Sequence, residues 1–63
     1  MYTAIVTVPS VFLYESPSAE NVSDELLSGW LVTVQNRQGN FLEITTDYGY
    51  TGWLECPAIR RLS

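Results

Sequence analysis

The residue types that most often carry catalysis are nearly missing from this chain. It contains no histidine and a single cysteine, Cys56. A Cys–His or Ser–His nucleophilic site cannot form within the 63 residues, because no imidazole base is available. The same composition excludes an internal disulfide and a zinc site with the usual ligands. We therefore expect a binding or packing module that has no catalytic residues, no metal and no cofactor.

Aromatic residues are the first candidates for ligand binding. In the alternating segment 41–46, Phe41 points away from Leu42 and Ile44, which predicts that its ring is outside the core. Aromatic rings with polar tips bind sugars and peptides by stacking and hydrogen bonding. The alternative is that Trp53 and one tyrosine complete a small core. The predicted ligand-binding aromatic residues are Tyr14, Phe41, Tyr48, Tyr50 and Trp53.

An acidic stretch in residues 15–25 is the second candidate. A carboxylate here would pair with a free amine of a ligand through a charge-assisted hydrogen bond. Glu15, beside Tyr14, is the first choice, and the alternative is that all of these carboxylates are solvated. Their spacing does not match a calcium-binding loop. The acidic residues of the stretch are Glu15, Glu20, Asp24 and Glu25.

A third candidate is an apolar patch around one turn. If Leu26 and Val32 face inward, then Leu27, Trp30 and Leu31 lie largely outside. Exposed apolar patches of this kind mark contact surfaces. We therefore predict that the patch docks on a neighbouring domain or, weakly, on a second copy of the chain. The alternative is that Trp30 folds back over the end of its own domain.

Composition limits the partners. The chain has 46% hydrophobic residues, and its seven acidic residues and three arginines give a net charge of −4. An acidic protein repels phosphate backbones and anionic lipids, so neither nucleic acid nor membrane is expected as a partner. No apolar run approaches the roughly 20 residues of a membrane span. The first residues lack a signal-peptide pattern.

The elements that must position these residues are short strands. Val, Ile, Thr and aromatic residues occur in runs that are separated by Pro, Gly, Asn, Asp and Ser. The pattern predicts a single all-β domain over residues 1–63, a small barrel of five to six strands. Strands are expected at 2–8, 11–14, 41–46, 50–54 and 60–62, with a loop at 15–25 and a 3₁₀ turn at 57–59. Residues 26–35 are expected to hold a Ser-Gly turn followed by a further strand. The expected inward residues are Ile5, Val11, Leu13, Leu26, Val32, Val34, Leu42, Ile44 and Leu54.

Four segments together resemble bacterial SH3-like (SH3b) domains. Residues 11–18 (VFLYESPS) resemble the family's VNLR-x-x-PS opening, and residues 26–34 (LLSGWLVTV) resemble its L-x-x-G-x-x-V-x-V segment. Residues 39–44 (GNFLEI) are similar to G-x-W-Y-K-V, and residues 47–54 (DYGYTGWL) to x-x-G-x-x-G-W-V. The order and spacing agree over most of the chain. Phe12 and Tyr14 depart from the usual asparagine and arginine.

The resemblance implies an SH3-like barrel that serves as a non-catalytic accessory module of a bacterial cell-wall hydrolase, such as an NlpC/P60 cysteine peptidase. Such a module binds or positions peptidoglycan, or packs on the catalytic domain, and an extracellular or cell-envelope location follows. One alternative is a protein–protein adaptor, because residues 11–15 (VFLYE) also resemble the ALYDY motif of eukaryotic SH3 domains. That family's tandem tryptophan is replaced here by Asn40-Phe41. The other alternative is a structural spacer.

Overall fold

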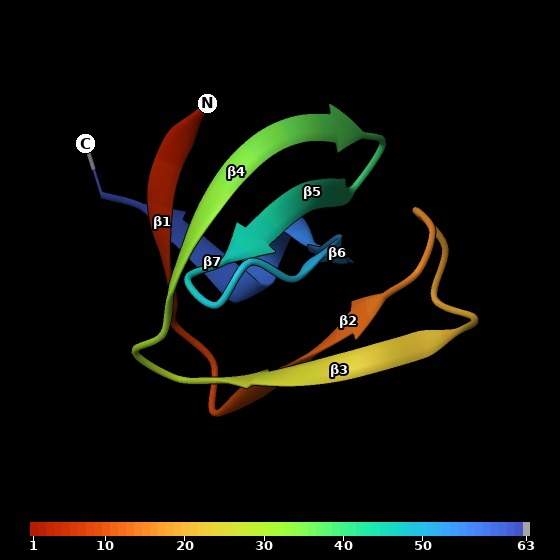
Figure 1. Ribbon diagram of the computed structural model, residues 1–63, viewed down its shortest axis with the longest axis horizontal. Coiled ribbons are helices and arrows are strands. Elements are labelled where there is room, and N and C mark those ends of the chain that lie inside the picture. Colours follow the sequence, from red (N-terminus) through yellow and green to blue (C-terminus); the bar gives the residue numbers. More distant parts are fainter. Residues whose placement is uncertain (63) are drawn as a thin grey trace.

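The computed structural model describes residues 1–62 and has an all-β fold (Figure 1). Its seven strands pair antiparallel in one sheet, in the order β3-β2-β6-β5-β4-β1-β7. This confirms the predicted class, a small all-β domain, with seven strands where five or six were expected. The strands are β1 (Tyr2–Val6), β2 (Ser10–Tyr14), β3 (Val22–Leu27), β4 (Leu31–Gln38), β5 (Phe41–Thr46), β6 (Thr51–Glu55) and β7 (Ile59–Arg61), with one 3₁₀ turn, η1 (Cys56–Ala58).

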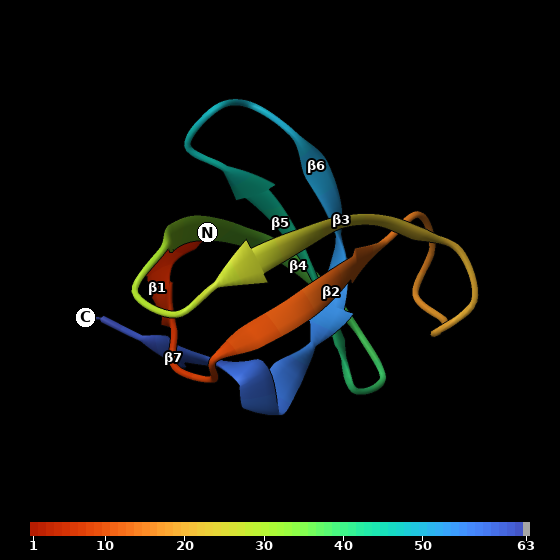
Figure 2. The same ribbon diagram turned by 90° about the horizontal axis from the view of Figure 1, so that it is seen from below.

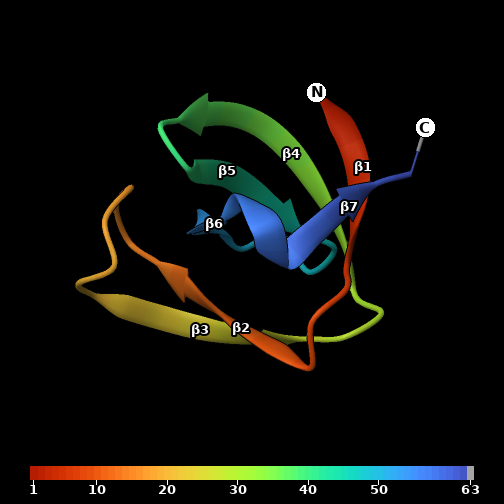
Figure 3. The same cartoon turned by 180° about the vertical axis from the view of Figure 1, so that it is seen from behind.

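The sheet is strongly curled, so its two halves lie on opposite sides of the core. Figures 1 and 3 show β2 and β3 on one side and β4 and β5 on the other. Figure 2, turned by 90°, shows β2 and β3 running side by side across the domain. Because the sheet bends in this way, a domain of this length encloses a core with a single sheet.

Seven of the nine residues expected to face inward are buried. Val11 is partly buried and packs against the core as expected, whereas Ile5 is partly buried and lies outside the core, so that expectation was wrong. On β1 the core residues are Ala4 and Val6, because the pairing with β4 and β7 turns the even-numbered side chains inward. Both alternating sets of β1 carry apolar residues, so the pattern of the sequence did not fix its register. The confirmed core residues are Leu13, Leu26, Val32, Val34, Leu42, Ile44 and Leu54.

Strand β3 corrects the predicted loop over residues 15–25. The chain becomes a strand at Val22 and pairs with β2 along the edge of the sheet. The hydroxyl of Ser23 donates to the carbonyl oxygen of Leu13 at 3.1 Å, where the register shifts. An edge strand exposes many of its side chains, so it accepts the polar residues that favoured a loop at the sequence level.

The turn between β3 and β4 is hydrogen-bonded to the end of β1. The backbone N–H of Gly29 donates to the carbonyl oxygen of Val6 at 2.8 Å, and the N–H of Val6 donates to that of Trp30 at 2.9 Å. Gly29 adopts a positive φ of 89°, a conformation that favours glycine. These bonds fix the backbone from which the Trp30 side chain projects.

Candidate functional site

Four aromatic residues lie together on the outer surface of β2, β5 and β6. The rings of Phe12 and Tyr14 meet edge to face with their centroids 6.4 Å apart, and those of Tyr14 and Phe41 do so at 6.1 Å. Trp53 is directly opposite Tyr14 in the ladder between β2 and β6. Tyr14 is buried, Phe41 and Trp53 are half-buried, and Phe12 is 49% exposed. We call these four residues the aromatic face.

Carboxylates alternate with the rings of the aromatic face. Residues directly opposite each other in antiparallel strands have Cβ atoms about 4.5–5.5 Å apart, so their side chains are neighbours. The combination suits a ligand that offers both a surface for stacking and a positive charge. Three glutamates, the face glutamates, each oppose an aromatic residue: Glu25 opposes Phe12, Glu43 opposes Trp53, and Glu55 opposes Phe41.

The aromatic face contains some of the residues expected from the sequence and omits others. Tyr14, Phe41 and Trp53 come together as expected. Tyr48 and Tyr50 are instead on and beside the turn between β5 and β6. Glu15 follows the end of β2, where its backbone N–H donates to the carbonyl oxygen of Asn21, and it belongs to neither ladder that carries the face.

The sequence interpretation included Glu25 among its acidic candidates but missed Phe12, Glu43 and Glu55. The sequence did contain a signal for these three residues, because each is two positions from an aromatic residue that had been selected. Phe12 is two residues before Tyr14, Glu43 two residues after Phe41, and Glu55 two residues after Trp53. Alternation along a strand places each pair on one side of the sheet.

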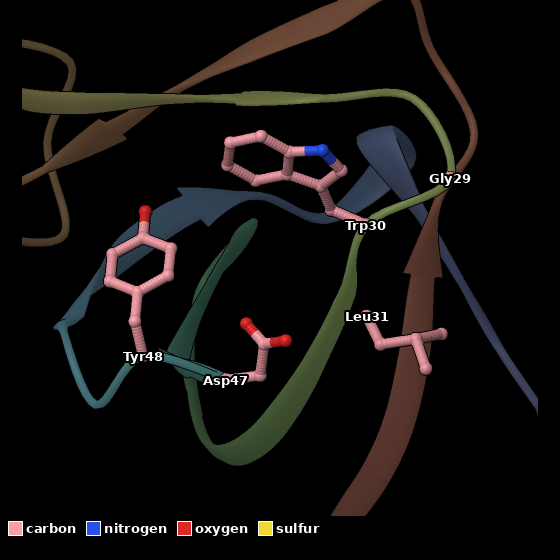
Figure 4. Close-up of a pocket in the computed structure, with 5 residues that line it drawn as sticks. All are labelled: Gly29, Trp30, Leu31, Asp47 and Tyr48. Carbon is pink, nitrogen blue, oxygen red and sulfur yellow. The ribbon is translucent and has the colours of Figure 1, made fainter.

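A second cluster forms a pocket beside Trp30. The pocket has a volume of about 350 Å³ and is lined by Gly29, Trp30, Leu31, Asp47 and Tyr48 (Figure 4). The rings of Trp30 and Tyr48 meet edge to face at 89°, with centroids 6.3 Å apart. Figure 4 shows the Asp47 carboxylate pointing toward the space between the two rings. We call this the Trp30 pocket.

The hairpin between β5 and β6 positions two residues of the Trp30 pocket. The N–H of Thr46 donates to the carbonyl oxygen of Tyr50 at 2.8 Å, and the N–H of Gly49 donates to that of Thr46 at 2.9 Å. The buried Thr46 hydroxyl accepts the N–H of Tyr50 at 2.9 Å. These bonds close a tight turn that carries Asp47 and Tyr48 toward Trp30.

A hydrogen bond joins this hairpin to β3. The Tyr48 hydroxyl donates to Asp24 Oδ2 at 2.7 Å. The bond from Tyr48, with a second from the backbone N–H of Glu25, lowers the pKa of the Asp24 carboxyl below its usual 3.8. The same bond raises the pKa of Tyr48 above 10.0, and burial and the charges of Asp24 and Asp47 add to this increase. Tyr48 is thereby held in place against Trp30.

Tyr48→Phe tests this bond through pH. Since folding lowers the pKa of Asp24, the stabilisation is present above about pH 3.8 and is lost as the pH falls through the folded value. Since folding raises the pKa of Tyr48, stabilisation is also lost as the pH rises above 10.0 through the folded value. Denaturant unfolding should therefore show wild type more stable than Tyr48→Phe at neutral pH and the difference shrinking at both extremes. Tyr50→Phe is the control, and an equal effect of both variants would contradict the assignment.

Comparison with known proteins adds no relative. No protein-family model, curated protein or solved structure matches the chain. Within residues 1–62 no helix is long and apolar enough to cross a membrane. The same part of the chain contains no group of three or more His, Cys, Asp or Glu side chains that could hold a metal ion. The candidate sites are therefore interpreted from their own chemistry.

The three residues of the predicted docking patch are exposed, as expected. Leu27, Trp30 and Leu31 keep 47%, 40% and 50% of their surface accessible. Trp30 and Leu31 line the Trp30 pocket, and the N–H of Trp30 donates to the carbonyl oxygen of Leu27 at 3.2 Å. Three exposed apolar side chains around one turn make a surface suited to contact with another protein.

Proposed function

We propose that this chain is a non-catalytic binding module of the SH3b type, an accessory part of a bacterial cell-wall hydrolase in the cell envelope. Its ligand is an amine-bearing peptide of peptidoglycan, held on the aromatic face. The glycan beside such a peptide offers a further surface for stacking. The exposed Leu27, Trp30 and Leu31 pack on the neighbouring catalytic domain, for which an NlpC/P60-type cysteine peptidase is the first candidate.

The observation that carries the proposal is the alternation of rings and carboxylates on one surface. The rings offer apolar area to a peptide backbone or sugar, and the face glutamates offer acceptors for an ammonium group. The arginines have the following contacts and backbone pairing. Arg37 donates to the carbonyl oxygen of Gly39, Arg60 is opposite Ile5 on β7, and the Arg61 guanidinium lies 4.4 Å from the centre of the Tyr2 ring.

The mechanism is positioning. A substrate held at the aromatic face is kept in register for a reaction in the neighbouring domain, and such positioning lowers the entropic part of the barrier. The chain itself supplies no histidine and a single cysteine, so it lacks the pair that a cysteine peptidase uses. The chemical step therefore belongs to the neighbour.

The proposal is tested by using calorimetry to measure the affinity of the domain for a soluble stem peptide that has a free amine. Phe12→Ala and Glu43→Gln should each weaken binding about fivefold, because each removes a contact of roughly 1 kcal/mol. Tyr50→Ala is the matched control for an exposed aromatic residue, and Glu20→Gln is the control for charge. Acetylation of the ligand amine should abolish the difference between Glu43→Gln and wild type. Equal weakening by the variants and their controls would refute the proposal.

A proline-rich peptide separates this proposal from the adaptor function. The aromatic residues of the face, Phe12 and Tyr14 among them, also suit apolar peptide groups, but recognition of polyproline does not need the face glutamates. Binding of the proline-rich peptide without binding of wall fragments would favour the adaptor. Absence of binding by either ligand would favour a structural spacer.

A further inference from the structure

The Trp30 pocket combines features that the docking patch alone does not explain. Its walls are two aromatic rings at right angles, and a carboxylate points between them (Figure 4). An apolar side chain entering this space would meet the charge of Asp47, whereas a cation would be attracted by that charge and by the faces of the rings. The pocket is therefore complementary to a cationic group that has a flat or apolar surface to place against the rings.

Hydrogen bonding shows which carboxylate is available to such a cation. Asp24 accepts the Tyr48 hydroxyl and the N–H of Glu25 at 2.7 and 2.8 Å, so it serves chiefly to orient the Tyr48 ring. Asp47 is exposed, and it sits in the hairpin held by Thr46 and Gly49. The negative charge of Asp24 lies beyond the Tyr48 hydroxyl and adds to the negative potential of the pocket.

We propose that the Trp30 pocket binds the guanidinium group of an arginine side chain on the surface of a protein partner. A planar guanidinium stacks on the Trp30 ring while its N–H groups donate to the Asp47 carboxylate. A lysine ammonium lacks the planar surface and is more strongly hydrated, so arginine fits this geometry better. The pocket of about 350 Å³ is large enough for one side chain.

This inference is independent of peptide binding at the aromatic face, and it specifies the chemistry of the partner for the docking patch. The two sites share no residue: the aromatic face lies on β2, β5 and β6, and the pocket lies between the β3–β4 turn and the β5–β6 hairpin. Asp47→Asn should leave peptide binding at the aromatic face unchanged. Loss of one activity without the other therefore tells which proposal has failed.

Titration of the labelled domain with three capped peptides tests the inference. The peptides are Gly-Arg-Gly, Gly-Lys-Gly and Gly-citrulline-Gly, each acetylated and amidated, so that citrulline keeps the shape of arginine without its charge. We expect the indole N–H signal of Trp30 and the amides of Asp47 and Tyr48 to shift saturably with the arginine peptide, less with lysine, and not with citrulline. Trp30→Phe removes one of the two indole N–H signals and so distinguishes the Trp30 signal from that of Trp53.

Asp47→Asn should weaken binding of the arginine peptide about fivefold, the effect of one exposed ion pair at the upper end of its range. Glu20→Gln, which removes the same charge from an exposed loop, should change the affinity by less than about twofold. Equal shifts with arginine and citrulline, equal or stronger binding of lysine, or no shift at about 10 mM peptide would each overturn the inference. The amide spectrum of each variant shows whether its fold is intact.

Discussion

Ile44→Ala should destabilise the domain by about 2–5 kcal/mol, the usual cost of truncating a fully buried side chain when the core relaxes only partly around the space. Ile44 is 0% exposed and lies on the central strand β5, opposite Val34 on one side and Gly52 on the other. Since small domains have total stabilities of only about 0.05–0.15 kcal/mol per residue, this loss should leave much of the variant unfolded. Urea unfolding followed by tryptophan fluorescence measures the change.

Graded controls make the Ile44 prediction specific. Ile44→Val removes one methylene and should cost only about 0.5–1.5 kcal/mol. Ile5→Val makes the same change at a partly buried position on β1 and should cost less than Ile44→Val. If Ile5→Val were the more damaging, the register of β1, which turns Ala4 and Val6 inward, would be wrong.

Gly52→Ala should destabilise the domain by about 1–3 kcal/mol. The cause here is overpacking, whereas Ile44→Ala leaves a cavity. A Cβ atom at Gly52 would be 2.5 Å from Leu13 Cγ, 2.8 Å from Leu13 Cδ2 and 3.0 Å from the carbonyl oxygen of Tyr14. Leu13 is fully buried beneath β6 and has little room to move. The absence of a side chain at Gly52 therefore lets β2 and β6 approach, and this approach brings Tyr14 opposite Trp53.

A double-mutant cycle tests the cause of the Gly52 effect. Leu13→Ala alone removes a core side chain and should cost about 2–5 kcal/mol. In the double variant the new methyl group occupies space that Leu13 has vacated, so the total should be smaller than the sum of the single effects by at least about 0.5 kcal/mol. Strict additivity would show that Gly52 matters for a reason other than contact with Leu13.

Much of the fold follows from local pattern. Strand β5 has the predicted bounds, Phe41–Thr46, because its strict alternation lies between two turn sequences that contain Gly39 and Gly49. Strand β3 was missed because its polar residues reflect its place at the sheet edge, which only the tertiary pairing determines. The inward side of β1 was likewise fixed by its two neighbours and not by its own apolar residues.

The candidate sites were predictable to the extent that they depend on the alternation of side chains between the two faces of a strand. Strand parity predicted that Phe41 faces outward, and the SH3b resemblance led us to expect Tyr14 and Trp53 beside it. The structure places all three residues together. The position of the Tyr48 side chain was not predictable, because its hydrogen-bond partner Asp24 lies 24 residues earlier in the chain, on β3. The contact of Tyr48 with Trp30 depends on the same long-range arrangement.

Titration of the labelled domain with a soluble stem peptide is the most direct test of the proposed function. The measurement compares a peptide with a free amine to the same peptide acetylated, and it follows the backbone amides and the glutamate carboxyl carbons. We expect saturable shifts at Phe12, Phe41 and Trp53, with the carboxyl carbons of Glu43 and Glu55 responding only to the free amine. No saturable shift at about 10 mM peptide, or shifts confined to residues outside the aromatic face, would contradict the proposal.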